Sequence, residues 1–366
     1  MVTLGGIGVL YTVISFKERE KWDQALIELK SHKDIYYMLS YHNLYRNLGD
    51  GEPYLFIFTY KNGEKILYPF LKRKLNHLPF LQNDLTEDVF DITTCYGYGG
   101  PIYSEIPKED IWKQFRTAFK KFCEEENIIT EFIRFHPLFH NQRMMEKFMS
   151  IEHNRYTVYI DLEKQEEEIF NHYHQNHRRN IKKAKKLGLQ FDMLQGEHAA
   201  KDLTHFMELY KQTMEKNQAD DYYYFSKNYF EELFRDLEHN AVMAVVRLQN
   251  RIIAAAIFLF SNNYLHYHLG CSDKQYLKMA PNNLLFHESA LWGKRKGFTK
   301  LHLGGGYKDN DQLFQFKSRF NPSGITSYYV GKEIHNLFVY EEVMRLWKQF
   351  YSKDKIENYL QFYWIN

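Results

Sequence analysis

The chain has few cysteines, and their spacing suits neither a disulfide framework nor a zinc site. Its three cysteines, Cys95, Cys123 and Cys271, lie far apart, and no C-x-x-C pair occurs. A reducing compartment is the natural setting for such cysteine usage. The chain also lacks any apolar run near the roughly 18 residues that a membrane-spanning helix needs, and residues 1–13 carry no basic leader. We therefore expect a cytoplasmic protein, with a transient contact at the inner membrane face as an open alternative.

An excess of charge of one sign is also missing. The 48 Lys and Arg against 46 Asp and Glu leave a net charge of +2, so no overall field favours nucleic acid. With 44% hydrophobic residues and a mean hydropathy of −0.56, the chain is expected to be globular. Its 366 residues are enough for two domains. Any contact with a polyanion must therefore come from a local patch.

What the chain does contain is an order of helices and strands that occurs twice. Turn residues separate β-branched runs and predict hairpins in both halves. The expected strands are residues 54–60 and 66–71, joined by a turn at Lys61-Asn62-Gly63, and residues 241–248, 252–260 and 264–270. The expected helices are residues 22–29, 111–125, 203–214, 229–237 and 282–296. This order indicates two α/β domains of similar build.

The last part of the chain has a different pattern. Apolar residues recur at three- and four-residue spacing between Leu337 and Phe350, which predicts one amphipathic helix. We expect this helix to dock on the first domain.

The segment most informative about function is a glycine cluster near the end of the chain. A short alternating strand runs into Gly304, Gly305 and Gly306, where the backbone can turn sharply or approach a ligand closely. Lys317 follows on a segment rich in phenylalanine, with Phe316 directly before it. One interpretation is a functional cation beside a glycine turn. The other is an ordinary loop followed by a core element that carries a lysine.

Four motifs occur in a fixed order along the chain. They are Tyr96-Gly97-Tyr98-Gly99-Gly100-Pro101, Arg134-Phe135-His136-Pro137, Asn180-Ile181-x-x-Ala184-x-x-x-Gly188, and Leu303-Gly304-Gly305-Gly306 with Phe316-Lys317. Each motif alone is weak, but the ordered set, from about Tyr54 to Phe320, resembles the FemAB/FemX family and its close acyltransferase relatives. No long helical-hairpin insertion interrupts the second half, so the chain is similar to the compact, FemX-like members.

The resemblance implies an α/β (α+β) fold of two tandem GNAT-like domains, each a mixed, largely antiparallel sheet flanked by helices. The N-terminal domain would comprise residues 1–155, with residues 335–366 packing back on it. The C-terminal domain would comprise residues 156–334 and carry the acyl-transfer site, with the acceptor held near the cleft between the domains.

The resemblance also implies acyl transfer to an amine. In FemX-like enzymes the donor is an aminoacyl-tRNA and the acceptor is an amine of a peptidoglycan precursor, while other relatives acylate amino sugars or small molecules. Phe316 and Lys317 correspond to the family's Phe-Lys pair beside the reaction centre. A fixed ammonium there would stabilise the negative charge that develops on the carbonyl oxygen. The alternative is a lysine on the surface of a helix.

A second candidate site is a basic helix that includes Arg178, Arg179, Lys182 and Lys183 and is expected to end at Gly188. A tRNA acceptor stem, a nucleotide diphosphate or a lipid diphosphate headgroup would suit such a patch. The alternative is a solvated helix face. Cations at the start of a helix oppose its dipole, which argues against a purely stabilising role.

Several aromatic and polar residues are further candidates for substrate binding. Tyr98 lies in a glycine-rich turn, and Arg134 and His136 share one motif at the expected end of a strand. His136 is either a general base or a hydrogen-bonded structural histidine. Tyr224 belongs to an aromatic run that lines an acceptor pocket or forms part of the core.

Neither a metal nor a cofactor is expected. His172, His174 and His177 are close in sequence, but their i, i+2, i+5 spacing does not place three ligands on one helix face. The acyl donor, aminoacyl-tRNA or acyl-CoA, is a substrate.

The residues before one expected helix distinguish the two donors. Coenzyme-A-dependent GNAT enzymes bind the donor's pyrophosphate with a glycine-bearing loop that opens a helix. Here residues 273–281 contain no glycine, although Lys274 and Lys278 can bind a phosphate as point charges. This departure favours an aminoacyl-tRNA donor and does not exclude coenzyme A.

Three functions therefore remain open at this stage. The first is aminoacyl transfer from tRNA to a cell-wall precursor. The second is acyl-CoA-dependent acylation of an amino sugar or an envelope glycan. The third is non-catalytic binding of a nucleotide-linked or lipid-linked glycan. No stable protein partner is implied.

Overall fold

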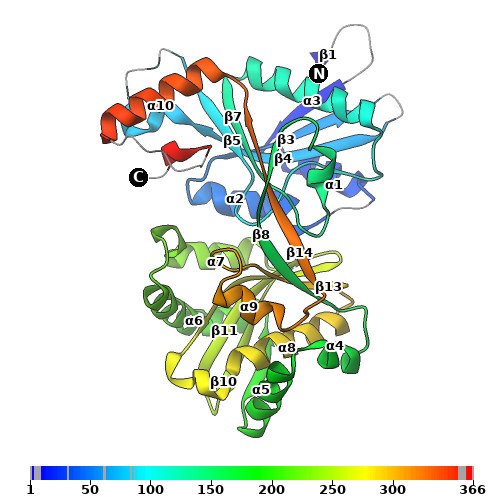
Figure 1. Ribbon diagram of the computed structural model, residues 1–366, viewed down its shortest axis with the longest axis vertical. Helices are drawn as coiled ribbons and strands as arrows, with labels where there is room; N and C mark the ends of the chain where they lie inside the picture. Colours follow the sequence, from blue (N-terminus) through cyan, green and yellow to red (C-terminus); the bar gives the residue numbers. More distant parts are fainter. Residues whose placement is uncertain are drawn as a thin grey trace. The chain divides into compact units, whose positions relative to one another are not determined.

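The computed structural model describes residues 2–3, 10–30, 33–60, 63–82, 85, 87–352 and 360–364. The chain forms two compact units, which are described separately (Figure 1). Unit 1 consists of residues 1–154 and 328–366, and unit 2 of residues 155–327. Most of the predicted turn at Lys61-Asn62-Gly63 lies outside the described residues, and so does most of the segment before Leu10.

Unit 1 is built on a mixed sheet whose strands follow the order β1-β2-β3-β4-β5-β7-β14, with β6 beside β4. The pairs are antiparallel except that β5 and β7 run parallel. The strands are β1 (Val2–Thr3), β2 (Leu10–Ser15), β3 (Glu52–Thr59), β4 (Lys65–Lys74), β5 (Phe90–Thr93), β6 (Ile102–Tyr103), β7 (Ile128–Arg134) and β14 (Ile325–Ile334).

Alternation along the strands gives this sheet two apolar faces. Phe56 and Phe58 of β3 pack in one core cluster with the apolar stripe of α3, which includes Phe115 and Phe119. A second cluster brings α10 against Ile129 of β7. The predicted return of the C-terminal helix to the first domain is therefore confirmed. The helices are α1 (Arg19–Glu28), α2 (Leu39–Asn47), α3 (Glu109–Glu125) and α10 (Leu337–Tyr351).

The sheet strands of unit 2 follow the order β8-β13-β12-β11-β10-β9. Their pairs are antiparallel except for β12 and β13, whose parallel ladder is short and ends at His266 and His302. Beyond that pair, β12 and β13 continue without pairing to each other. The strands are β8 (Ser150–Asp161), β9 (Gln190–Leu194), β10 (Ala241–Leu248), β11 (Arg251–Ser261), β12 (Tyr264–Ser272) and β13 (Lys300–Gly304).

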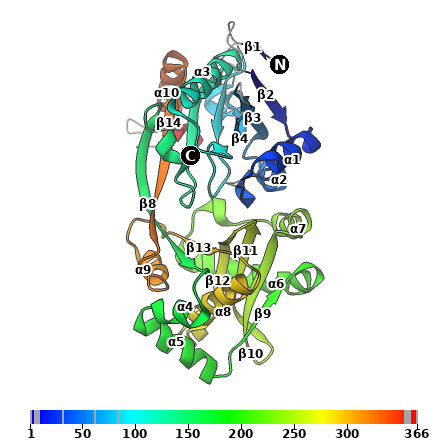
Figure 2. The same ribbon diagram turned by 90° about the vertical axis from the view of Figure 1, so that its right-hand side faces the viewer.

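Helices cover both faces of the unit 2 sheet (Figure 2). Val242 and Ala244 of β10 share a core cluster with Leu285 of α8. On the other face, α6 and α7 pack against the sheet, and the thiol of Cys271 contacts the carbonyl of Phe206 on α6. The helices are α4 (Glu166–His172), α5 (Gln175–Lys186), α6 (Gly196–Asn217), α7 (Lys227–Asp236), α8 (Pro281–Arg295) and α9 (Gln312–Ser318).

The predicted α/β class, with mixed and largely antiparallel sheets flanked by helices, is confirmed. The predicted strand at residues 241–248 coincides with β10, and most other predicted elements shift by at most three residues at their ends. The helix predicted over residues 203–214 is α6, which begins seven residues earlier, at Gly196. Cys95, Cys123 and Cys271 are free and buried. Among the described residues, no helix combines the length and apolarity needed to cross a bilayer.

Candidate active site

The glycine cluster forms a tight loop at the end of β13, here called the glycine loop (Gly304–Tyr307). Gly304 has a φ of +68°, in the left-handed region that favours glycine. A Cβ on Gly305 would lie 2.5 Å from the carbonyl oxygen of Tyr156, and one on Gly306 would lie 1.9 Å from Asp311 Oδ1. Glycine is therefore required here for space as well as for conformation.

Three charged side chains of unit 2 hold the backbone of the glycine loop. Arg155 Nη1 donates to the carbonyl of Gly306 at 2.8 Å. The Asp311 carboxylate accepts from the N–H of Tyr307 at 2.7 Å. Lys317 Nζ donates to the carbonyl of Gly305 at 2.7 Å. The structure thus brings together the glycines and the lysine that the sequence identified, and it adds Arg155 and Asp311.

Helix α9 carries Phe316 and Lys317, and its first turn explains why it begins where it does. Asp311 is the N-cap residue, and its Oδ1 accepts from the N–H of Phe314 at 2.8 Å. Phe314 and Phe320 are buried in the unit 2 core. Lys317 is only 4% exposed, so it is not a surface lysine.

Burial determines the electrostatics of Lys317. Loss of hydration lowers the pKa of Lys317 to about 7, an effect that the Asp311 carboxylate opposes and the Arg155 guanidinium reinforces. Burial by itself would raise the pKa of Asp311, but hydrogen bonds from backbone N–H groups lower it. The Lys317 amine also lies 5.0 Å from the centre of the Tyr267 ring. Lys317 is therefore a buried cation that loses its proton far more easily than an ordinary lysine.

The basic helix α5 presents one face to the core and the rest to solvent. Ile181 and Ala184 are buried in the unit 2 core, whereas Arg179, Lys182 and Lys183 are exposed. The helix ends as the sequence predicts. Leu187 is its C-cap, and Gly188 follows with a φ of +75°.

The cations of α5 have few acidic partners. Lys185 forms an ion pair with Glu288 of α8 at 2.7 Å. Within the described part of the chain, Arg178, Lys182 and Lys183 form no ion pair with a carboxylate. A patch of cations without acidic partners is what a polyanion contact requires.

His177 at the start of α5 is a residue whose role sequence reasoning missed. Its Nε2 donates to the carbonyl of Phe316 at 2.9 Å, directly beside Lys317. His172 and His174 have other partners, since His172 Nδ1 lies 2.7 Å from the Glu168 carbonyl and His174 accepts from the first turn of α5. The short spacing of the three histidines drew attention to metal binding, and nothing in the local sequence pointed to α9.

The candidates in unit 1 form a second group. His136 Nε2 lies 2.8 Å from Asp34 Oδ2, while Nδ1 accepts from the N–H of Leu138. Both ring nitrogens are thus engaged, which favours the structural interpretation over a general base. Arg134 Nη1 donates to the hydroxyl of Thr93 at 2.9 Å. Tyr98 makes a ring contact with His136 at 5.7 Å between centroids.

Tyr224 differs from the other candidates in its exposure. It is 41% exposed in the turn that follows the 3-10 helix Asp221–Tyr223. Its backbone N–H bonds the carbonyl of Asp221. Among the described residues, its side chain forms no hydrogen bond, ion pair or ring contact with the glycine loop or with Lys317.

The segment before α8 forms a 3-10 helix, Lys274–Met279, rather than a glycine-bearing cradle. Asp273 caps it by accepting from the N–H of Gln275 at 2.9 Å. Pro281 is the first residue of α8, so the helix begins with a residue that has no N–H. An anion at this helix start would find fewer backbone N–H donors than at a helix that begins after a glycine-bearing loop of the coenzyme-A-binding type.

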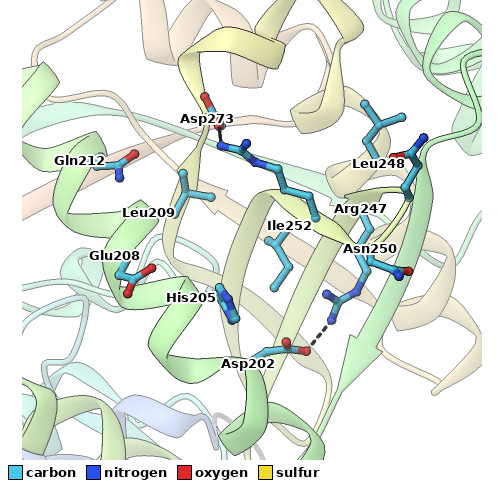
Figure 3. A pocket seen from close by; sticks show the side chains of 12 residues that line it. Asp202, His205, Glu208, Leu209, Gln212, Arg247, Leu248, Asn250, Ile252 and Asp273 are labelled. Carbon is cyan, nitrogen blue, oxygen red and sulfur yellow. Dashed lines mark hydrogen bonds and ion pairs between the residues drawn. The ribbon is translucent and has the colours of Figure 1, made fainter.

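A pocket of about 650 Å³ in unit 2 lies between α6 and the turn that joins β10 to β11 (Figure 3). Two arginines that line it each pair with an aspartate of the lining. Arg247 bonds Asp202, and Arg251 bonds Asp273 at 2.8 Å. None of the residues predicted from the sequence as a site lines this pocket.

Among known protein families, acetyltransferase (GNAT) domains match residues 171–318 of the chain. No curated protein is similar enough in sequence to match the chain. The matched region contains α5, the glycine loop and Lys317. The residues of the candidate site, apart from Arg155, therefore lie in the region that matches GNAT domains.

Solved structures are similar to the chain over most of its length. The crystal structure of FemX is 14% identical, with a TM-score of 0.67 over 91% of this chain and 99% of that one. The structure of L-PGS from Bacillus licheniformis is 15% identical, with a TM-score of 0.54 over 91% and 96%. The C-terminal domain of a putative lysylphosphatidylglycerol synthetase from Agrobacterium fabrum is 12% identical, with a TM-score of 0.53 over 88% and 93%. At these identities the likeness concerns the fold, and it confirms the resemblance to FemX.

Proposed function

We propose that this chain, an acyltransferase of the GNAT fold, transfers an aminoacyl group from aminoacyl-tRNA to an amine of a peptidoglycan precursor. The observation that carries this proposal is the buried amine of Lys317, which is fixed on the carbonyl of Gly305 at 2.7 Å. Both residues lie in the part of the chain that matches GNAT acetyltransferase domains. The FemX-like fold is consistent with this reaction.

The proposed chemistry needs no covalent intermediate on the protein and no cofactor. The acceptor amine attacks the ester carbonyl of the donor, a C–N bond forms, and the negative charge moves to the carbonyl oxygen. When the tetrahedral intermediate collapses, the C–O bond to the tRNA breaks, and the proton lost by the amine ends on the departing hydroxyl oxygen. An ammonium N–H that meets the oxyanion in a site with little water stabilises this transition state.

The position of Lys317 suits this role. One N–H of the ammonium is engaged with Gly305, which leaves further N–H groups for a substrate oxygen. Because burial lowers the pKa of Lys317 to about 7, the charged form is costly in the free protein. Negative charge on the bound substrate would offset that cost, so the cation is most stabilised when the oxyanion forms.

Two observations support tRNA rather than coenzyme A as the donor. The segment before α8 offers a capped 3-10 helix and Pro281 where a pyrophosphate would need free backbone N–H groups. Helix α5 displays Arg179, Lys182 and Lys183 to solvent, as binding of a nucleic acid backbone requires. With tRNA as the donor, the reaction belongs in the cytoplasm.

A transfer assay with two donors tests the proposal. Purified protein is offered charged tRNAs and acyl-CoAs with labelled acyl groups, together with a nucleotide-linked peptidoglycan precursor. We expect label on the acceptor that disappears after RNase treatment of the donor and weakens steeply with salt. RNase-resistant transfer from acyl-CoA would replace this proposal with the acyl-CoA-dependent alternative.

Parallel acceptor arms identify what receives the acyl group. Amino sugars and phosphatidylglycerol vesicles replace the peptidoglycan precursor under the same conditions. Transfer to an amino sugar or to the lipid, but not to the precursor, would overturn the proposed acceptor. Tight binding of a precursor without transfer from either donor would leave the non-catalytic binding function.

A further inference from the structure

The start of helix α5 is tied to the end of helix α9 by two hydrogen bonds. The backbone N–H of His174 donates to the carbonyl of Arg319 at 2.8 Å. His177 Nε2 donates to the carbonyl of Phe316 at 2.9 Å. The positive end of the α5 dipole thus meets the negative end of the α9 dipole, which is a favourable arrangement.

The carbonyl of Phe316 depends on His177 for a partner. The last carbonyls of a helix have no donor within the helix, and α9 ends at Ser318. The N–H of Phe320, which would bond Phe316 in a longer helix, bonds Lys317 instead at 3.0 Å. The Ser318 hydroxyl bonds the carbonyl of Gln315 at 3.1 Å. His177 therefore completes the end of α9.

The side chain of His177 is held in one orientation and one protonation state. It is 2% exposed, and its ring lies 4.9 Å from that of Phe316 and 4.4 Å from that of Phe320. Burial lowers the pKa of His177 to about 4, so the ring is neutral near pH 7. Because a carbonyl can only accept, the proton lies on Nε2. Nδ1 is buried and has no hydrogen-bond partner among the described residues.

We propose that His177 is a positioning residue for acyl transfer, because its Nε2–H fixes the Phe316 carbonyl and thereby holds Lys317 against the glycine loop. This inference rests on the proposed function of Lys317. The inference goes beyond that function because it assigns a role to a residue of the basic helix that faces the core, whereas its neighbour Arg179 is exposed.

The geometry explains why the effect reaches Lys317. Lys317 is the residue that follows Phe316, and its own hydrogen bond to Gly305 spans the space between α9 and the glycine loop. Loss of the His177 donor would leave the part-buried Phe316 carbonyl without a partner, and such a group seeks water. The last turn of α9 would loosen, and water would reach the Lys317 amine. A misplacement of a charged group by about 1 Å can cost 100-fold in rate.

Three substitutions separate the hydrogen bond from the packing of the ring. His177→Gln places an amide N–H close to the position of Nε2 but has no ring. His177→Asn is of similar polarity, but its amide N–H reaches only the position of Nδ1. His177→Phe keeps the ring contacts and has no donor. The same substitutions at His172, an exposed residue on α4, are the matched controls.

The first measurement does not depend on activity. Protein labelled with 13C at lysine Cε gives a titration midpoint for Lys317, whose resonance is assigned by its loss in Lys317→Met. We expect a wild-type midpoint near 7, and in His177→Phe and His177→Asn a rise of about one pH unit as water reaches the amine. His177→Gln should keep the wild-type midpoint, and the His172 variants should not change it.

The second measurement is steady-state transfer. We expect kcat to fall about 10- to 100-fold in His177→Phe and His177→Asn with KM nearly unchanged, and to recover most of its value in His177→Gln. Equal losses in His177→Gln and His177→Asn would overturn the assigned hydrogen bond in favour of ring packing. If His177→Phe does not fold, the comparison of His177→Gln with His177→Asn still distinguishes the hydrogen bond from the ring packing.

The two proposals can fail separately. Wild-type protein that transfers no acyl group from any donor would overturn the proposed function, while the midpoint of Lys317 would still report on positioning. A wild-type midpoint in all three variants would overturn the positioning role of His177, whatever the activity of the protein.

Discussion

Unit 1 and unit 2 each bury a cation, but the two cations have partners of different charge. Arg116 of α3 is 2% exposed, and Lys317 of α9 is 4% exposed. Arg116 forms two parallel hydrogen bonds to the carboxylate of Glu131, at 3.0 and 2.8 Å. Among the described residues, Lys317 bonds only the carbonyl of Gly305, and its nearest acid, Asp311, is occupied by backbone N–H groups.

The pKa values follow from this difference in partners. Burial by itself would raise the pKa of Glu131, but the charge of Arg116 and the hydrogen bonds from His335 and Arg116 lower it to about 2. Burial lowers the pKa of Lys317 to about 7, and Asp311 offsets only part of that effect. The ion pair of unit 1 is therefore locked in its charged form. The lysine of unit 2 lies close to the point at which it loses its proton.

The comparison distinguishes a structural charge from a functional one. A buried ion pair with two hydrogen bonds holds both groups in their charged forms, so neither charge needs a ligand as its partner. A buried cation that has only a neutral acceptor is stabilised further when negative charge arrives. Perturbed groups of this second kind cluster at functional sites. We therefore propose that the chemistry belongs to unit 2 and that Arg116 has a structural role.

The largest expected effect comes from breaking the ion pair of unit 1. Glu131→Gln leaves the Arg116 guanidinium buried without a counter-charge, and we expect a loss of about 3–5 kcal/mol in the free energy of unfolding. Urea unfolding at pH 7 measures it. The double variant Arg116→Met/Glu131→Leu is the control and should lose less, because no charge remains. A loss under about 1 kcal/mol in Glu131→Gln would mean that the pair behaves like one on the surface.

The next effect comes from removing the cation of unit 2. We expect Lys317→Met to lower kcat/KM for acyl transfer by about 100- to 1000-fold, the usual cost of losing one group that stabilises an oxyanion. The melting temperature of Lys317→Met should stay near that of the wild type. The substitution removes the hydrogen bond to Gly305, but it also removes the cost of burying a charge. Lys317→Arg keeps a cation and should retain more activity than Lys317→Met. Unchanged turnover in Lys317→Met would exclude Lys317 from the mechanism.

Both groups should make the free energy of unfolding rise with pH, but over different pH ranges. The pKa of Lys317 is about 7 in the folded state, against 10.5 for an ordinary lysine exposed to water. Between these values the unfolded chain binds the extra proton, so the free energy of unfolding rises with pH by up to about 1.4 kcal/mol per unit. The pKa of Glu131 is lowered from 4.5 to about 2, so its contribution is complete above 4.5 and is lost as the pH falls toward 2.

Urea unfolding at pH 7 and pH 9 isolates the lysine contribution. The difference in unfolding free energy between wild type and Lys317→Met should change in favour of the wild type as the pH rises. Lys113→Met, at an exposed position of α3, is the control and should show no such trend. A difference that is constant between the two pH values would mean that the pKa of Lys317 in the folded protein lies above this interval.

Much of this fold can be predicted from the sequence, because its signals are local. The turn after Leu248 and the β-branched runs on either side predict the hairpin of β10 and β11. The apolar spacing between Leu337 and Phe350 predicts α10. Glycine, phenylalanine and lysine in residues 304–317 identify the candidate site. These signals depend on residues close in sequence, where period and turn chemistry act directly.

The contacts that complete the site cannot be predicted in this way. Arg155 bonds a carbonyl 151 residues further along the chain, and His177 bonds one 139 residues away. Neither contact leaves a periodic or compositional trace, because a backbone carbonyl is the same for every residue type. Asp311 is an exception. An aspartate directly before the short helix that carries Phe316 is a local N-cap signal.

The smallest expected effect tests whether Asp311 and Gly306 act as one unit. A methyl group on Gly306 would fall 1.9 Å from Asp311 Oδ1, so Gly306→Ala must displace the carboxylate that caps α9. Asp311→Ala removes the same carboxylate. We expect each variant to lose about 1–2 kcal/mol of stability, the cost of a lost N-cap, and to lower kcat/KM because Lys317 loses its fixed position.

A double-mutant cycle decides the matter. If both substitutions act through the cap, Gly306→Ala/Asp311→Ala should be no worse than either single variant, which gives a strong coupling energy. Asp309→Ala, at an exposed position of the same segment, is the matched control and should leave both stability and turnover unchanged. Additive losses would mean that Gly306 is needed for its own backbone. The position of Lys317 would then depend on Gly305 and α9 alone. The Asp311 carboxylate, which bonds backbone N–H groups and does not pair with Lys317 as Glu131 pairs with Arg116, would have no part in it.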